Sequence, residues 1–216
     1  MKNNQPKLLV TGFGAFQEFD QNPSQDIAQK ANGQTLHGVQ VVGLSLPVSW
    51  KRAWPLVQKA ILRHKPSGLL MFGLAPGHWF RFERVAINRN KPFFDVDNSR
   101  PPAVEIVPEG AELIESTLPL GWLYEQIQGC PGQRGPEVRY SDDAGGYLCN
   151  QVFYHAMNRL ENTVPWRGFV HVPAYPTGGI HSEAQLSESE ILDVGLFLVE
   201  RLSWWIAERV KPRVDE

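Results

Sequence analysis

Cysteine is scarce in this sequence, which has only Cys130 and Cys149 among its 216 residues. Two cysteines are too few for a disulfide framework or for a zinc site. This scarcity fits a reducing, cytoplasmic setting in which both thiols stay free. A disulfide between the two cysteines remains an alternative, and it would consume both thiols.

Long apolar runs and an excess of positive charge are also missing. No run approaches the ~18 apolar residues of a membrane span, and residues 1–7 lack the apolar core of a signal peptide. The net charge of −2 and the absence of a basic run argue against nucleic acid as a partner. The 42% hydrophobic and 20% charged residues are typical of a globular protein, and the length predicts one domain over residues 1–216.

Several catalytic motifs are absent as well. The sequence contains no HExxH, no P-loop, no GxGxxG and no GxSxG. The chemistry that remains consists of a cysteine, a histidine and a carboxylate, each in a distinct local setting.

The cysteine lies in residues 141–154, which are typical of a strand end, a glycine turn and an amphipathic helix over about 149–160. Gly145 and Gly146 let the backbone turn just before Cys149. A cysteine in the first helical turn lies near free N–H groups and the positive end of the helix dipole, which favours a thiolate nucleophile. The alternative is that Cys149 is a small buried apolar residue.

The histidine and the carboxylate both lie in predicted strands. His171 is flanked by Val170 and Val172, and it is either a core histidine or a catalytic base. Glu83 lies in a predicted strand over residues 80–88, on the same face as Val85 and Ile87. A carboxylate on an apolar face needs a partner. Glu83 either pairs with Arg81 or Arg84, or it orients a catalytic base.

Predicted strands and helices alternate along the chain. We expect strands over residues 7–11, 39–46, 69–74, 80–88, 137–140 and 168–173, and helices over 23–32, 50–64, 119–128, 149–160 and 188–210. A long loop over 89–112 includes one or two short strands around 103–107, and a glycine-rich turn covers 129–135. This alternation predicts an α/β fold with a mainly parallel sheet between helix layers.

In such a sheet the site lies at the carboxyl ends of the strands. The loop over residues 13–19, the segment after Glu83, the turn before Cys149 and the end of the His171 strand can meet there. The phenylalanines of the loop either cover the core or wall an apolar pocket. Together the three reactive side chains are the material of a Cys-His-acid triad.

The sequence resembles the pyroglutamyl peptidase I family of cysteine peptidases, also called pyrrolidone carboxyl peptidases, which remove N-terminal pyroglutamate. The resemblance follows the order of the family's blocks from about residue 7 to residue 176. Those blocks are Val10-Thr11-Gly12-Phe13, Asn22-Pro23-Ser24, Glu83-Arg84-Val85-Ala86-Ile87-Asn88, Ser116-Thr117-Leu118-Pro119, Cys149-Asn150 with Phe153-Tyr154, and Gly168-Phe169-Val170-His171-Val172-Pro173.

The resemblance implies Cys149 as nucleophile, His171 as base and Glu83 as the third member, with Phe13 and Phe16 as walls of the pyroglutamyl pocket. It implies an α/β/α sandwich, small peptides with N-terminal pyroglutamate as substrates, a homo-oligomer that is often a tetramer, and no metal or cofactor.

The sequence departs from the family in the loop after residue 88. Phe93 stands where the family carries an arginine thought to help the oxyanion, and Arg89 or Lys91 are candidates to replace it. This departure motivates a second hypothesis, a family member that binds peptide or lactam with weak or lost turnover. A nucleoside-phosphorylase-like enzyme is a third hypothesis, supported only by analogy of fold.

Overall fold

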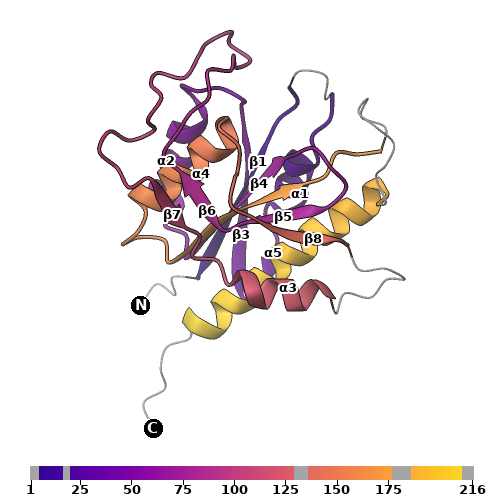
Figure 1. Cartoon of the computed structure of the whole chain (residues 1–216). Helices are drawn as coiled ribbons and strands as arrows, with labels where there is room; N and C mark the ends of the chain where they lie inside the picture. Colours follow the sequence, from indigo (N-terminus) through magenta and orange to yellow (C-terminus); the bar gives the residue numbers. More distant parts are fainter. Residues whose placement is uncertain (1–4, 17–19, 129–135, 177–185, 211–216) are drawn as a thin grey trace.

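The central feature of the computed structural model is a seven-stranded sheet, shown in Figure 1. The structure describes residues 5–16, 20–128, 136–176 and 186–210. The strands of the sheet, in spatial order, are β2 (Thr35–Leu36), β3 (Val39–Leu46), β1 (Lys7–Phe13), β4 (Gly68–Leu74), β9 (Trp166–Val172), β5 (Phe80–Glu83) and β8 (Val138–Ser141).

The sheet is mixed but mainly parallel. Strands β3, β1, β4 and β9 run parallel to one another, and β5 runs parallel to β8. The short edge strand β2 is antiparallel to β3, and β5 is antiparallel to β9. The reversal at β5 matters for the site, because it brings two β5 side chains next to the end of β9.

Helices cover both faces of the sheet (Figure 1). On one face α1 (Pro23–Ala31), α3 (Leu120–Gln128) and α5 (Glu188–Val210) bury their apolar sides in a common core. On the other face α2 (Ala53–His64) and α4 (Leu148–Arg159) do the same. The predicted three-layer α/β/α sandwich is confirmed.

The central strands are buried on both faces, which explains their unbroken apolar sequences. In β1 the side chains of Leu8 and Val10 face the core with α1 and α5, and Leu9 faces the core with α2 and α4. All three are fully buried, as are Leu69–Phe72 in β4. This pattern is the one expected of strands inside a parallel sheet.

Helix α1 lies unusually close to the sheet because glycines face it. The N-cap Asn22 accepts a hydrogen bond from the backbone N–H of Ser24 at 3.1 Å, as the sequence predicted. A methyl group added at Gly12 would lie 1.8 Å from the carbonyl oxygen of Ser24, and one at Gly43 would lie 2.0 Å from that of Ala28. Only glycine at these two sheet positions lets the helix backbone approach this far.

The strand predicted over residues 80–88 is wrong in one respect, because it is interrupted at Arg84. Strand β5 ends at Glu83, and the next strand, β6 (Val85–Ile87), pairs with β7 (Leu113–Glu115) in a separate two-stranded sheet. The short strands predicted around residues 103–107 are also wrong. That segment is irregular, and the pairing strand comes ten residues later at β7.

Most other elements agree with the prediction to within three residues at either end. Strand β3 has the predicted bounds, and the capping box of α5 is present: the Ser187 N–H donates to Glu190 Oε2 at 2.7 Å. The turn predicted over 129–135, with Cys130, and residues 17–19 of the predicted loop lie outside the described residues. In the part of the chain that is described, no helix has the length and apolar character needed to cross a membrane.

Candidate active site

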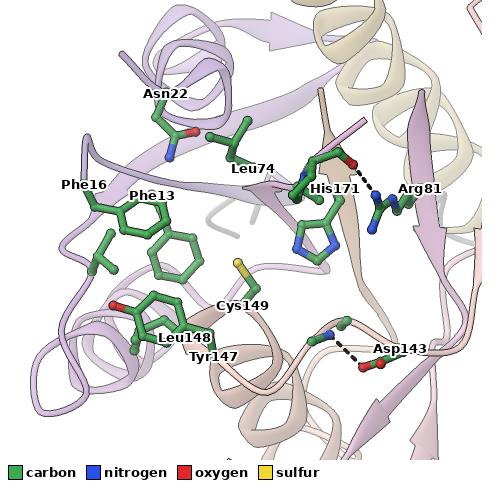
Figure 2. A pocket seen from close by; sticks show the side chains of 15 residues that line it. Phe13, Phe16, Asn22, Leu74, Arg81, Asp143, Tyr147, Leu148, Cys149 and His171 are labelled. Carbon is green, nitrogen blue, oxygen red and sulfur yellow. Dashed lines mark hydrogen bonds between the residues drawn. The ribbon is translucent and has the colours of Figure 1, made fainter. Parts of the chain in front are cut away.

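A cavity of about 300 Å³ opens at the carboxyl ends of β1, β4 and β9. Its volume is at the lower end of the range for small-molecule sites. Most of its lining is apolar, and Figure 2 shows the lining side chains. The residues that line it are Phe13, Phe16, Asn22, Val48, Leu74, Ala75, Pro76, Arg81, Asp143, Ala144, Gly145, Tyr147, Leu148, Cys149 and His171.

Cys149 presents a free thiol to this cavity from the first turn of α4. The N-cap residue Tyr147 makes no side-chain cap hydrogen bond, so the N–H groups at the start of the helix stay open for a ligand. The sulfur has room because β4 carries a glycine beside it. A methyl group at Gly73 would lie 2.7 Å from Cys149 Sγ.

The electrostatic setting of the thiol differs from the one predicted. Burial and, to a lesser degree, the negative charge of Glu83 raise the pKa of the Cys149 thiol to about 12, and its own backbone N–H offsets only part of this. Burial therefore opposes the thiolate stabilisation that the helix start predicts. A neighbouring base would offset this effect by taking the thiol proton.

A base lies beside it. His171, near the end of β9, lines the same cavity, and Figure 2 shows its imidazole ring next to the Cys149 sulfur. Its Nδ1 lies 2.7 Å from Glu83 Oε1. A carboxylate only accepts, so Nδ1–H donates and Nε2 is the nitrogen left to accept a proton. The ring also contacts Phe169, with centroids 4.8 Å apart.

Glu83 reaches His171 across the antiparallel pair β5–β9. Arg81 is directly opposite His171 and Glu83 is opposite Phe169, so Glu83 is the diagonal neighbour of His171 on one face of the sheet. The Glu83 side chain is fully buried, and its Oε2 has no hydrogen-bond partner among the described residues. A buried carboxylate with one bonded oxygen depends strongly on that single partner.

Two sequence expectations about Glu83 are corrected by this geometry. Its partner is neither Arg81, whose Nη2 donates to the carbonyl oxygen of Pro76, nor Arg84, which pairs with the Asp142 carboxylate. It also does not share a sheet face with Val85 and Ile87, because those residues belong to the other sheet. Of the two readings of Glu83, the partner of a histidine is the one that the structure bears out.

Phe13 and Phe16 line the side of the cavity opposite His171 (Figure 2). Phe13 is almost fully buried and belongs to the core of the α2–α4 face, so it covers the core and walls the cavity at once. Phe16 contacts Tyr147, with ring centroids 5.9 Å apart. The Tyr147 ring in turn contacts Trp50 edge-on at 5.1 Å. The result is an aromatic wall on one side of the sulfur.

The segment over residues 89–95 contributes none of the lining residues of this cavity. Arg89 and Lys91 are both exposed and are not among the lining residues, so a role for either in place of the family's arginine stays a prediction. Phe93 packs its ring edge-on against Tyr147 at 6.1 Å. The segment is fixed by the buried Asp95, which accepts hydrogen bonds from the N–H groups of Trp50, Asp97 and Ser99.

Arg81 and Tyr147 are site residues that the sequence prediction missed. Tyr147 lies within residues 141–154, two positions before Cys149. This closeness in sequence to the nucleophile could have predicted Tyr147 as a site residue. Arg81 lies two residues before Glu83, and strand alternation places both on one face. The sequence prediction treated Arg81 only as an ion-pair partner for Glu83 and did not assign it a position at the cavity.

Comparisons with known proteins agree with this geometry. A sequence model of the family described as pyroglutamyl peptidase matches residues 6–196. The pyrrolidone-carboxylate peptidase of Oceanobacillus iheyensis is 32% identical over 171 residues, which are 78% of this chain and 84% of that protein.

Solved structures of similar proteins have the same fold. The pyrrolidone carboxyl peptidase from Thermococcus litoralis superimposes with a TM-score of 0.85 at 25% identity, over 98% of this chain and 99% of that one. Pyroglutamyl peptidase I from Bacillus amyloliquefaciens gives 0.82 at 26% identity, over 92% and 97%. With its fold, the order of its sequence blocks and most of its length in agreement, the chain belongs to the pyroglutamyl peptidase family.

Proposed function

We propose that this protein is a cysteine peptidase that hydrolyses the N-terminal pyroglutamyl group from peptides. The observation that carries the proposal is the buried Glu83–His171 pair beside a cavity that also holds the Cys149 thiol. The names of its relatives supply the substrate class. A pyroglutamyl ring carries no charge, which suits a cavity whose walls are mostly apolar.

In the first half of the reaction, His171 Nε2 takes the proton of the Cys149 thiol as the sulfur attacks the carbonyl carbon of the scissile amide. Since burial raises the pKa of the Cys149 thiol, the proton leaves as the S–C bond forms. Glu83 holds the imidazole by Nδ1 and stabilises the imidazolium that results. The start of α4 has no side-chain cap, and in this proposal its backbone N–H groups bind the oxyanion.

The second half releases the products. The C–N bond breaks as His171 returns the proton to the leaving amine, and a thioester remains on Cys149. His171 then takes a proton from water, whose oxygen attacks the thioester carbon. The C–S bond breaks, the thiol regains its proton and pyroglutamate leaves.

Hydrolysis of a chromogenic pyroglutamyl amide tests the proposal. We expect turnover that is proportional to enzyme concentration in the parent and is lost in Cys149→Ser, with a pyroglutamyl adduct on Cys149 detectable by mass spectrometry after rapid acid quenching. Parental turnover in Cys149→Ser would overturn the assignment of the nucleophile.

The second candidate is a binding protein with weak turnover. It is favoured by Phe93, which stands where the family carries an arginine and packs against Tyr147 outside the cavity lining. The same assay separates the two functions. Saturable binding of pyroglutamyl peptide without product would support the binding protein.

A further inference from the structure

Arg81 is the one arginine or lysine among the described residues that line the cavity. Its guanidinium is held in place by the carbonyl oxygen of Pro76 and by the face of the Trp79 ring, 5.6 Å away. Within the described part of the chain, no carboxylate lies within ion-pair distance of it. Arg81 therefore presents an oriented positive charge and unused N–H donors.

The position of Arg81 relative to the reacting atoms follows from the sheet. It is directly opposite His171 in the β5–β9 pair, and Figure 2 shows it beyond the imidazole, on the side away from Phe13 and Phe16. In the proposed reaction the acyl group occupies the aromatic side of the sulfur. The leaving amine must lie at His171, because His171 protonates it. The residue after pyroglutamate therefore extends toward Arg81.

The leaving residue offers a matching group when it is the last residue of the substrate. Its carboxylate carbon is then two bonds from the leaving nitrogen, on the Arg81 side of the imidazole. A planar guanidinium binds a carboxylate through two parallel hydrogen bonds. Among the described residues that line the cavity, Asp143 is the carboxylate; its Oδ1 accepts the Gly145 N–H, and its charge is opposite to that of Arg81.

We infer that Arg81 makes the site selective for pyroglutamyl dipeptides, by binding the free carboxylate of their second residue. The inference rests on the proposed function and adds to it a substrate class. It also assigns a role to a cation that does not come from the segment over residues 89–95.

The test compares pyroglutamyl-alanine with pyroglutamyl-alanine amide, which differ in the charge at the carboxyl end. Release of alanine or alanine amide is followed by chromatography for the parent, Arg81→Gln and Arg139→Gln. Arg139 is the matched control, because its guanidinium also lies over Trp79, at 3.6 Å, but it pairs with Glu137 and does not line the cavity.

We expect the parent and Arg139→Gln to favour the free acid in kcat/KM by on the order of tenfold, the size of a charge-assisted hydrogen bond. Arg81→Gln should lose this preference, so that its ratio of kcat/KM for the acid to kcat/KM for the amide falls to about one. Equal use of both substrates by the parent would overturn the inference, and so would a preference that survives in Arg81→Gln. If Arg81→Gln does not fold, the parental ratio alone decides.

Failure of the inference is distinguishable from failure of the proposed function. If the parent hydrolyses the neutral chromogenic amide but uses pyroglutamyl-alanine and its amide equally, the proposed function stands. The proposed role of Arg81 is then rejected. A parent that hydrolyses none of the three compounds loses both.

Discussion

At the scale of single residues, the Glu83–His171 contact determines what the site can do. A buried carboxylate that bonds Nδ1 fixes the tautomer in which Nε2 is free to take a proton. The sequence predicted the three reactive residue types, but for Glu83 it left open a pairing with Arg81 or Arg84 beside the orientation of a catalytic base. The actual partner is 88 positions away, and only folding brings the two together.

We expect Glu83→Gln to lower kcat by a factor on the order of 10² to 10⁴ while the fold survives, because the amide has nearly the same shape but can donate to Nδ1 and favour the other tautomer. The measurement is steady-state hydrolysis of a pyroglutamyl amide, with circular dichroism as the check on folding. Asp142→Asn is the control, since Asp142 is an exposed carboxylate paired with Arg84 outside the cavity. A folded Glu83→Gln protein within about tenfold of the parent would leave a Cys149–His171 dyad.

The raised pKa of Cys149 leads to a second expectation at this scale. A thiol whose pKa lies near 12 is protonated throughout the neutral range, so its thiolate fraction grows tenfold per pH unit until that value is approached. Alkylation by the neutral reagent iodoacetamide, followed by peptide mapping of Cys149, should accelerate steadily from about pH 7 to pH 10 without a plateau. A plateau at neutral pH would instead indicate a preformed thiolate–imidazolium pair.

At the scale of secondary-structure elements, β4 makes room for the nucleophile of α4. A side chain at Gly73 would meet both Cys149 Sγ and the Phe169 ring at 2.7 Å. We expect Gly73→Ala to displace the sulfur and lower kcat/KM by about 100-fold, since a misplacement of about 1 Å in a reacting group can have this effect. In the control Gly121→Ala the added methyl meets open space. Parental activity in Gly73→Ala would show that the sulfur position is not critical.

Element prediction from the sequence succeeded where periodicity and capping coincide. The apolar run of β4, the Asn22 N-cap and the Ser187–Glu190 capping box each define an element by local physics. The continuous strand over residues 80–88 failed because both halves have strand composition. Their separation at Arg84 depends on distant partners, β9 and β8 for one half and β7 for the other.

The same limit explains the thiol. The sequence indicated a helix start at Cys149, and α4 begins one residue earlier, at Leu148. The depth of burial around the sulfur depends on β4 and β9, which local patterns do not reveal. From the sequence alone, therefore, the rise in the thiol pKa caused by burial could not be compared with the fall in pKa that a helix start favours.

At the scale of the whole molecule, the close docking of α1 joins the core to the cavity. Helix α1 packs on β1, β3 and α5, and just before it Asn22 lines the cavity. The Ser24 hydroxyl accepts the N–H of Phe13 at 3.0 Å. A shift of α1 away from the sheet would therefore also move the aromatic side of the cavity.

We expect Gly43→Ala to impose such a shift, because the added methyl would lie 2.0 Å from the carbonyl oxygen of Ala28. Overpacking against a backbone atom should lower the free energy of unfolding by about 1–3 kcal/mol, measured by urea denaturation. The KM for a pyroglutamyl amide should rise at the same time. An unchanged free energy of unfolding in Gly43→Ala would show that α1 can shift without destabilising the fold. The expected coupling between the position of α1 and the cavity would then be rejected.

The alternation of strands and helices predicted the α/β/α architecture, but not the order of its strands. The insertion of β5 between β9 and β8, antiparallel to β9, follows from packing of the complete sheet. Sequence analysis could therefore predict that Cys149 and His171 lie at the same edge of the sheet. It also proposed Glu83 for this site, but it could not predict that β5 would lie beside β9 and antiparallel to it.

Strand β5 has a consequence for how this site can change by mutation. Its four residues place Glu83 and Arg81 on one face, two positions apart, where one holds the imidazole from the core and the other faces the cavity. Inserting a single residue between Phe80 and Arg81 would shift the register of both side chains and turn them to the opposite face. Base orientation and the proposed charge selectivity would then be lost in one genetic event. Point substitution is left as the route by which selectivity can change while catalysis persists.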